Sequence, residues 1–250
     1  MAGSRTYRVR AVVLDKVKLK ETDLILTLLS EDGRQVRAVA KGARKPGSRL
    51  AARCELFCTA DLLLARGRNL DVVSQAELLS APLGAGATYE RLCAASSIAE
   101  LARYCSYEDS EDPFVYAICE RALACTGDAS VDEVHLDLVV AAFAFKVLAH
   151  LGYRPVLDSC VMCGDGAVSS FSAQAGGLMC ASCASGVPGA EQLDANQVSW
   201  LRSLLALRFD ELAAAPADGP TAAFLLALAH IWAATHLDAR LRALEFMLGR

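Results

Sequence analysis

The sequence predicts a multidomain α+β protein, in which a small N-terminal β-barrel precedes an all-α domain that carries an inserted four-cysteine finger. Three observations predict this class. Short apolar runs separated by turn residues fill the chain up to about residue 80. Beyond Pro82 the apolar residues recur at helical spacing, and two Cys-x-x-Cys pairs lie in a Gly- and Ser-rich insert at about 155–190. The predicted domains are residues 1–80 and 81–250, with the finger inside the second.

The first predicted domain contains about five strands in about 75 residues. Residues 7–19 alternate in part, which places every second residue from Tyr7 to Val13 on one face. Asp32-Gly33 lies between two apolar runs and predicts a hairpin. A second hairpin is expected to start near Cys54 and to turn between Gly67 and Asn69. So short a sheet must protect its edges, so we expect a closed or nearly closed barrel.

The second predicted domain begins with helical periodicity over residues 87–106 and 112–126. A capping-box pattern that starts at Ser130 predicts the beginning of a long apolar helix, which should stop at Gly152. Asp194 is expected to cap a further helix.

The end of the chain predicts one more helix, which starts after the "PADGP" segment and runs to about Leu248. Its apolar stretch, residues 221–237, is short for a membrane span and carries two histidines, which favours a buried helix. The start of the chain, "MAGSRTYRVR", has no apolar core of a secretory signal. We therefore expect a cytoplasmic protein without a membrane partner.

The cysteine pattern is the most specific feature of the chain. Cys160 and Cys163 form one Cys-x-x-Cys pair, Cys180 and Cys183 form the other, and this is zinc-ribbon spacing. Four thiolates close the coordination sphere of the metal, which predicts one structural Zn²⁺ and no position for a catalytic water. The other six cysteines are expected to be packed, apolar residues.

The charge of the chain is unevenly distributed. Up to Ser80 there are 15 basic and 9 acidic residues, whereas the rest of the chain has 10 basic and 20 acidic residues. The segment "KGARKPGSRL" concentrates cations among glycines on the loop between the third and fourth expected strands. A small barrel with cationic loops is typical of proteins that bind single-stranded nucleic acid.

Eight basic residues of the barrel are predicted to contact nucleic acid, with those of the glycine-rich loop as the centre: Lys41, Arg44, Lys45, Arg49, Arg34, Arg37, Lys16 and Lys18. Aromatic residues are scarce, since only Tyr7 and Phe57 lie in the first 80 residues. Weak base stacking predicts contact dominated by phosphates, with little sequence preference.

No enzyme motif is present in the sequence. A zinc deaminase needs His-x-Glu and Pro-Cys-x-x-Cys, and neither occurs. The chain also has no Walker A loop, dinucleotide fingerprint, His-Glu-x-x-His or nucleophile elbow. The sequence therefore predicts a binding protein with no catalytic residues and no small-molecule substrate.

Several segments together resemble the RecO family of bacterial recombination mediators. "ETDLILTLLSEDG" and "VAKGARKPGSRL" are similar to its barrel signature, and "GRNLDVVSQAEL" to its last barrel strand. "LGYRPVLDSCVMCG" and "AGGLMCASC" resemble its zinc-bearing segment, and "HLDARLRALEFM" its C-terminal helix. The similarity covers nearly the full chain in order.

The resemblance implies an N-terminal OB-fold and a role in DNA repair and recombination. It implies binding of single- and double-stranded DNA and annealing of complementary strands. It also implies partnership with RecR, with the C-terminal tail of single-strand-binding protein (SSB) and, indirectly, with RecA, in a bacterial cytoplasm near the nucleoid. SSB tails are acidic and end in apolar residues. Arg121, Arg202, Arg240 and Arg242 are the candidate basic spots for such a tail in an otherwise acidic domain.

Three alternatives remain open from the sequence. The first is a zinc-ribbon, OB-fold RNA-binding or transcription-associated factor, which a preference for RNA over single-stranded DNA would favour. The second is a nuclease with dispersed carboxylates, which Mg²⁺-dependent cleavage would favour. The third is a scaffold that joins proteins and contacts DNA only weakly.

Overall fold

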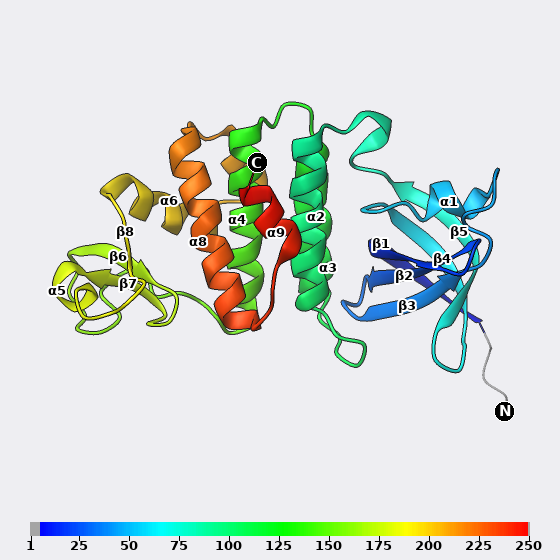
Figure 1. Cartoon of the computed structure of the whole chain (residues 1–250), viewed down its shortest axis with the longest axis horizontal. Helices are drawn as coiled ribbons and strands as arrows, with labels where there is room; N and C mark the ends of the chain where they lie inside the picture. Colours follow the sequence, from blue (N-terminus) through cyan, green and yellow to red (C-terminus); the bar gives the residue numbers. More distant parts are fainter. Residues whose placement is uncertain (1–5, 250) are drawn as a thin grey trace. The chain divides into compact units, whose positions relative to one another are not determined.

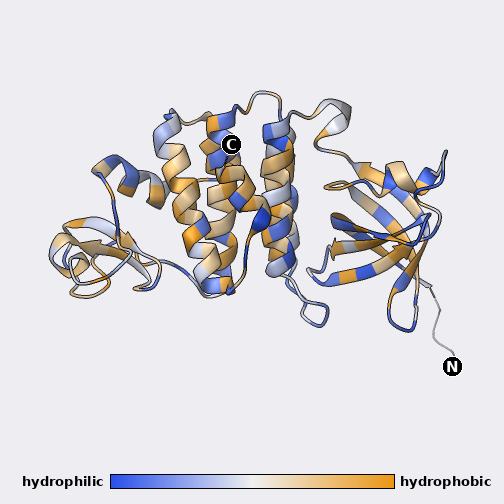
Figure 2. Cartoon of the chain, viewed as in Figure 1, coloured by the Kyte–Doolittle hydropathy of each residue, from blue (hydrophilic) through white to orange (hydrophobic). Residues whose placement is uncertain are grey.

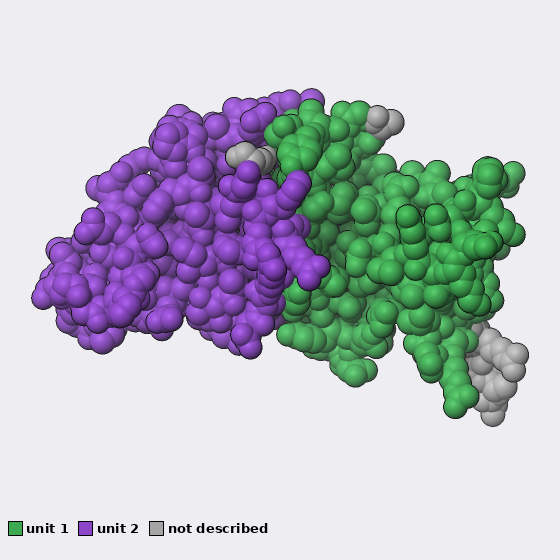
Figure 3. All heavy atoms as spheres, viewed as in Figure 1, with its two compact units in different colours: residues 1–128 green, residues 129–250 purple. Residues whose placement is uncertain are grey.

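The computed structural model describes residues 6–249 (Figure 1). The first five residues, at the start of the segment considered for a secretory signal, lie outside the described residues, as does Arg250. The chain divides into two compact units, residues 1–128 and 129–250 (Figure 3). The first unit holds more than the predicted barrel, because two helices after residue 80 belong to it. The predicted domain boundary at residue 80 stays a prediction.

The first unit begins with a closed five-stranded barrel in the order β1-β2-β3-β5-β4. The strands are β1 (Thr6–Leu19), β2 (Asp23–Ser30), β3 (Gln35–Ala40), β4 (Thr59–Ala65) and β5 (Asp71–Ser80). β3 and β5 pair in parallel, and the other pairs are antiparallel. This is the arrangement of an OB-type barrel, so the expected closure is confirmed.

The barrel interior follows the predicted alternation. Ala11 and Val13 of β1 are fully buried, together with residues of β2 and β4 such as Leu28 and Leu64. Both expected hairpins form, and Gly33 takes a positive φ of 86° in the first turn, where a residue without a side chain is favoured.

The connection from β3 to β4 differs from the expected plain loop. It contains a short helix, α1 (Arg49–Arg53), and β4 begins at Thr59, five residues after Cys54. Phe57 has a φ of 68°, and its N–H donates to the Val13 carbonyl. The chain therefore turns onto β1 before β4 starts. Apolar residues alone could not indicate this turn, because Phe57 and Cys58 are as buried as strand residues.

The rest of the first unit is helical. After a 3₁₀ turn (Gly84–Gly86), α2 (Tyr89–Tyr104) and α3 (Pro113–Gly127) form as expected and pack on each other. The Gln35 side chain of β3 donates to the carbonyls of Arg103 and Ser106, which fastens the barrel to the end of α2.

The second unit contains the long helix α4 (Glu133–His150), which Asp132 caps by accepting the His135 N–H. The prediction that Ser130 is the capping residue is wrong by two positions, because the Asp132 carboxylate takes the N–H that an N-cap must satisfy. The helix stops before Gly152, whose φ is 98°, as predicted.

The finger follows α4. It contains the three-stranded sheet β7-β6-β8, built from β6 (Val168–Ser172), β7 (Gly177–Cys180) and β8 (Glu191–Gln192), with the short helix α5 (Ala181–Ala184). Then come α6 (Ala195–Ala206), α7 (Phe209–Ala214), α8 (Gly219–Leu237) and α9 (Arg242–Leu248). Asp194 caps α6 in a capping box, as predicted.

The single last helix predicted from the sequence is two helices. Asp238 adopts a left-handed conformation at the end of α8, with a φ of 47°, and the chain re-enters a helix at Arg242. α8 is long and apolar enough to cross a membrane by length and composition (Figure 2). However, it packs on α4, and Leu225, Trp232 and Ala233 are buried within the unit. The expectation of a buried helix is confirmed in part, since α8 is partly buried.

Candidate nucleic-acid interface and metal centre

The glycine-rich basic loop, residues 41–48, is a chain of turns between β3 and α1. The Lys45 N–H donates to the Gly42 carbonyl and the Ser48 N–H to the Lys45 carbonyl, each at 3.1 Å. Gly42 and Gly47 have φ values of 65° and 74°, a region that costs residues with a Cβ. The glycines of the motif are therefore required by the turns.

The loop is fastened to the turn between β1 and β2. The Gly42 N–H donates to Asp23 Oδ1 at 2.7 Å, and the Arg44 N–H donates to the Thr22 carbonyl at 2.8 Å. Arg44 Nη1 also donates to the Glu21 carbonyl at 2.9 Å. Two segments that are about twenty residues apart thus meet at one end of the barrel.

Five exposed cations gather there, and we name this surface the basic end: Lys18, Lys20, Lys41, Arg44 and Lys45. Among the described residues, no carboxylate forms a salt bridge with any of them. The pKa of Asp23 is lowered by the Gly42 N–H, and the charges of Lys20 and Lys41 act in the same direction. The basic end therefore keeps most of its positive charge available to a ligand.

The other predicted contact residues lie elsewhere or are engaged. Lys16 forms an ion pair with Glu55, and its side chain is only 17% exposed. Arg34, at the opposite end of β3, pairs with Asp32 at 2.6 Å and lies 3.8 Å from Glu111. Arg37 is exposed in the middle of β3, and Arg49 is exposed at the first position of α1. All four stay predictions as DNA contacts. Lys16 and Arg34 are the weaker candidates, because carboxylates already neutralise their charges.

The aromatic residues of the barrel are not free to stack on bases. The Tyr7 hydroxyl donates to Asp71, and the Arg66 guanidinium lies 4.9 Å above the Tyr7 ring. Burial raises the pKa of Tyr7, and the bond to Asp71 raises it further. Phe57 is buried. This geometry favours contact through phosphates, as the aromatic content of the sequence predicts.

The sequence gives no sign that the loop forms hydrogen bonds with the Asp23 carboxylate or with the backbone carbonyls of Glu21 and Thr22. The segment "ETD" looks like an ordinary polar turn, and only the barrel topology brings it beside residue 42.

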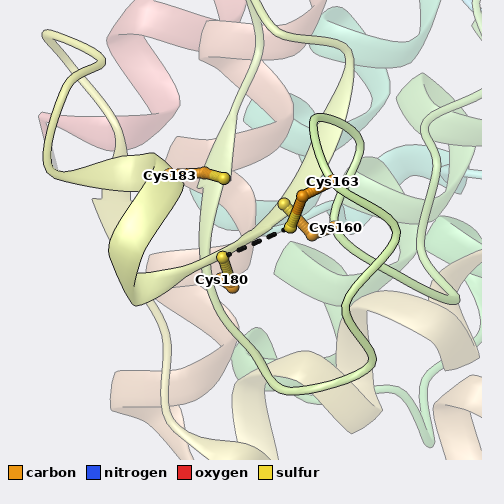
Figure 4. A group of neighbouring side chains, drawn as sticks. All are labelled: Cys160, Cys163, Cys180 and Cys183. Carbon is orange, nitrogen blue, oxygen red and sulfur yellow. Dashed lines mark hydrogen bonds between the residues drawn. The ribbon is translucent and has the colours of Figure 1, made fainter.

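The four cysteines of the finger converge from two knuckles (Figure 4). The first knuckle is the loop that carries Cys160 and Cys163. The second is the junction of β7 and α5, which carries Cys180 and Cys183. The four sulfur atoms all lie within 4.8 Å of one another, and the Cys163 and Cys180 sulfurs are 3.7 Å apart. A tetrahedral zinc with Zn–S bonds of about 2.3 Å places its sulfurs about 3.8 Å apart, so the donor set and spacing fit this ion.

The backbone prepares the cluster for a metal. The Cys180 N–H, together with those of Cys163 and Met162, lowers the pKa of Cys160 to about 6. Hydrogen bonding to the Cys180 and Cys163 sulfurs raises the pKa of Cys183, because these bonds stabilise its protonated form. Removing protons from such a set is what a divalent metal does on binding.

All ten cysteines carry free thiols. Five of the six outside the cluster are buried, and Cys125 is half-buried. Within residues 6–249, the finger holds the one group of at least three potential ligands that converges on a point.

A cleft of about 290 Å³ lies in the first unit between the barrel and α3. Its walls are mixed apolar and polar, with Phe57, Thr59, Ser80, Pro82, Glu120, Arg121, Leu123 and Ala124. The Glu120 carboxylate accepts from the Tyr116 hydroxyl at 3.0 Å and the Thr59 hydroxyl at 3.3 Å. Arg121 is exposed on the rim, so it is the cation of this cleft that faces solvent.

Comparisons with known proteins agree with this geometry. Residues 1–82 match the family model for the N-terminal part of recombination protein O, and residues 86–245 match that for its C-terminal part. The chain is 34% identical to DNA repair protein RecO of Nocardioides sp., covering 96% of this chain and 98% of the relative. It is 37% identical to that of Frankia casuarinae, with the same coverage. It is 38% identical to that of Cutibacterium acnes, covering 80% of this chain and 82% of the relative.

Proposed function

The chain belongs to the RecO family of DNA repair proteins, which are non-enzymatic recombination mediators, and from this premise we propose that it binds single- and double-stranded DNA and anneals complementary strands. The observation that carries the proposal is the basic end of the barrel. Its two lysine-bearing segments are held together by hydrogen bonds, and its cations are free of salt bridges to described carboxylates.

The basic end works by neutralising phosphates. Lys18, Lys20, Lys41 and Lys45 are exposed and each provides one charge. Arg44 uses some of its donors to hold the loop and retains others for a phosphate oxygen. Because the barrel aromatics are engaged, bases stay free to pair with an incoming strand. Annealing requires this property, and a base-stacking platform would oppose it.

The mediator role adds protein partners. We propose that the chain acts with RecR to help load RecA onto DNA coated by SSB, as its family implies, in the cytoplasm of a bacterium and near the nucleoid. The cleft beside α3 supports a site for the SSB tail. Its apolar floor of Phe57, Pro82 and Leu123 suits an apolar end, and Arg121 on the rim suits an acidic peptide. The carboxylate of Glu120 is already satisfied by hydroxyl donors.

The finger is proposed to hold one Zn²⁺ through Cys160, Cys163, Cys180 and Cys183. The role of this ion is structural, since four protein thiolates leave no open coordination position for water or substrate. When bound, the ion joins the two knuckles and so stabilises the small sheet between them.

A binding experiment tests the DNA proposal directly. The Lys45→Glu protein should bind a fluorescent single-stranded oligonucleotide at least about tenfold more weakly than the wild type, because a phosphate contact becomes a repulsion. The control is Arg8→Glu, which makes the same charge change near the start of β1, far along the strand from the basic end. Equal loss in both variants, or a marked preference for RNA in the wild type, would contradict the proposal.

A further inference from the structure

Two acidic residues, Glu21 and Asp23, lie among the cations of the basic end, and only Asp23 holds the loop through its side chain. Asp23 opens β2 and is partly exposed, with Lys20 and Lys41 close enough to affect its charge. On electrostatic grounds alone, a carboxylate here would weaken binding of any polyanion. Its presence therefore calls for a structural reason that outweighs this repulsion.

The contacts of Asp23 supply that reason. Its Oδ1 atom accepts the Gly42 N–H at 2.7 Å and the Thr22 hydroxyl at 3.1 Å, so it bridges the β1–β2 turn and the basic loop. Gly42 is the first residue of the loop with a positive φ, and the bond holds it where the chain turns back. The Lys45 side chain passes over Gly42, so that a Cβ on Gly42 would lie 3.4 Å from Lys45 Cδ.

We propose that Asp23 is a positioning residue for DNA binding, which fixes the basic loop against the β1–β2 turn so that Lys20, Lys41 and Lys45 present their charges as one preformed surface. This inference rests on the proposed DNA-binding function of the basic end. Without the Asp23–Gly42 bond the loop still carries its cations, but they no longer keep a common arrangement, and DNA binding must then order the loop.

The surrounding contacts support this assignment. Three further hydrogen bonds join the same segments, from the Arg44 N–H to the Thr22 carbonyl and from Arg44 Nη1 to the Glu21 and Lys20 carbonyls. In all three, Arg44 donates to a backbone carbonyl, an acceptor that every residue type provides. Among the described residues, Asp23 is the one whose side chain accepts a hydrogen bond from the loop. Its bond is therefore the one that a substitution can remove.

Three variants separate the effect of Asp23 on the position of the loop from the effect of its negative charge on DNA binding. Asp23→Ala removes both the acceptor and the negative charge, Asp23→Asn keeps the acceptor but removes the charge, and Glu31→Ala removes one charge at the opposite end of β2. Affinity for a single-stranded oligonucleotide is measured together with hydrogen exchange of the Gly42 amide in protein without DNA. Lys45→Glu is included as a test of the basic end itself.

Asp23→Ala should bind DNA about fivefold more weakly, the loss expected for one hydrogen bond, although it is less negative than the wild type. Asp23→Asn and Glu31→Ala should bind as tightly as the wild type or more tightly. The Gly42 amide should exchange faster only in Asp23→Ala.

The failures are distinguishable. If Asp23→Ala binds DNA as well as Asp23→Asn while Lys45→Glu loses binding, the positioning role is overturned and the DNA interface stands. If Lys45→Glu also keeps its affinity, the proposed DNA interface is overturned. Unchanged exchange at Gly42 in Asp23→Ala would show that the contact does not hold the loop.

Discussion

The ring of Phe171 and the indole of Trp232 lie 5.4 Å apart between centroids, and this contact joins the finger to the helices of the second unit. Phe171 lies on β6, and Phe145 of α4 completes the cluster at 6.3 Å from Phe171 and 5.9 Å from Trp232. All three side chains are fully buried. Order in the finger is therefore coupled to the packing of α4 and α8.

This coupling predicts the effect of breaking the cysteine cluster. Cys160→Ser should abolish zinc binding and lower the melting temperature by on the order of 10 °C, since a structural zinc contributes several kcal/mol to folding. Metal content and thermal unfolding measure the two effects. Cys125→Ser is the matched control, because Cys125 lies on α3 outside the cluster and its replacement should leave zinc content unchanged. A zinc-free variant with unchanged melting would refute the structural role.

In the turn between β2 and β3, adding one methyl group at Gly33 should strongly lower the stability of the protein. A Cβ on Gly33 would lie 1.9 Å from the Asp112 carbonyl oxygen, and Gly33 has a positive φ. Gly33→Ala should therefore destabilise the protein by more than about 2 kcal/mol in urea unfolding, through overlap added to backbone strain. Gly47→Ala provides the comparison, because its φ is also positive but no atom lies within 4 Å. Equal destabilisation in both would show that backbone strain alone accounts for the loss.

His135 predicts a pH dependence of stability. Its Nδ1 lies 2.6 Å from Asp132 Oδ1, and its Nε2 lies 2.9 Å from the Ala215 carbonyl oxygen. Burial lowers the pKa of His135, but the Ala215 carbonyl and the Asp132 carboxylate outweigh it and raise the pKa above its ordinary value. A raised pKa stabilises the fold fully below the unfolded pKa, and this stabilisation disappears as the pH rises through the folded pKa.

The measurement is the difference in melting temperature between wild type and His135→Gln. This difference should be larger near pH 5.5 than near pH 8.5, about one unit or more on either side of the ordinary histidine pKa. Subtracting the variant removes the contribution of His236, whose pKa burial lowers. A difference independent of pH would mean that the pKa of His135 is the same in the folded and the unfolded protein, and would contradict this prediction.

The basic end predicts a specific salt dependence. Each of Lys41→Ala and Lys45→Ala should reduce the slope of log affinity against log salt by about one, because each removes one phosphate contact. Lys16→Ala should change the slope less, since Glu55 already pairs with Lys16. Oligonucleotide titrations at a series of salt concentrations measure the slopes. Identical slopes for all three variants would show that phosphates are not bound where the loop lies.

The sequence predicts the barrel and the four-cysteine cluster well because both have short-range signals. The Asp32-Gly33 turn and the alternation along β1 specify strands locally, and the spacing from Cys160 to Cys183 specifies a tetrahedral donor set. Two of the three described non-glycine residues with a positive φ, Phe57 and Asp238, could not be predicted, because neither type favours a left-handed conformation strongly enough to indicate a turn. Tertiary contacts decide both.

The composition of the proposed DNA-binding surface is predictable from the sequence, whereas its arrangement is not. The cations of residues 41–49 are visible in the sequence, but Lys16 and Arg34 look equivalent to them until the carboxylates of Glu55 and Asp32 are placed beside them. The contact of Asp23 with Gly42 depends on which strand ends meet in the barrel. Pairing between distant segments carries no local sequence signal.

The rate of strand annealing is the measurement that decides whether this chain is a recombination mediator. Two complementary oligonucleotides, each coated with SSB from the same organism, are mixed without ATP in the presence of the wild-type protein or of Lys41→Glu/Lys45→Glu. We expect a large acceleration by the wild type and little or none by the variant, because the basic end must hold phosphates while the bases pair. Annealing at the uncatalysed rate with the wild type, under conditions where it binds single-stranded DNA, would contradict the mediator function proposed for this chain.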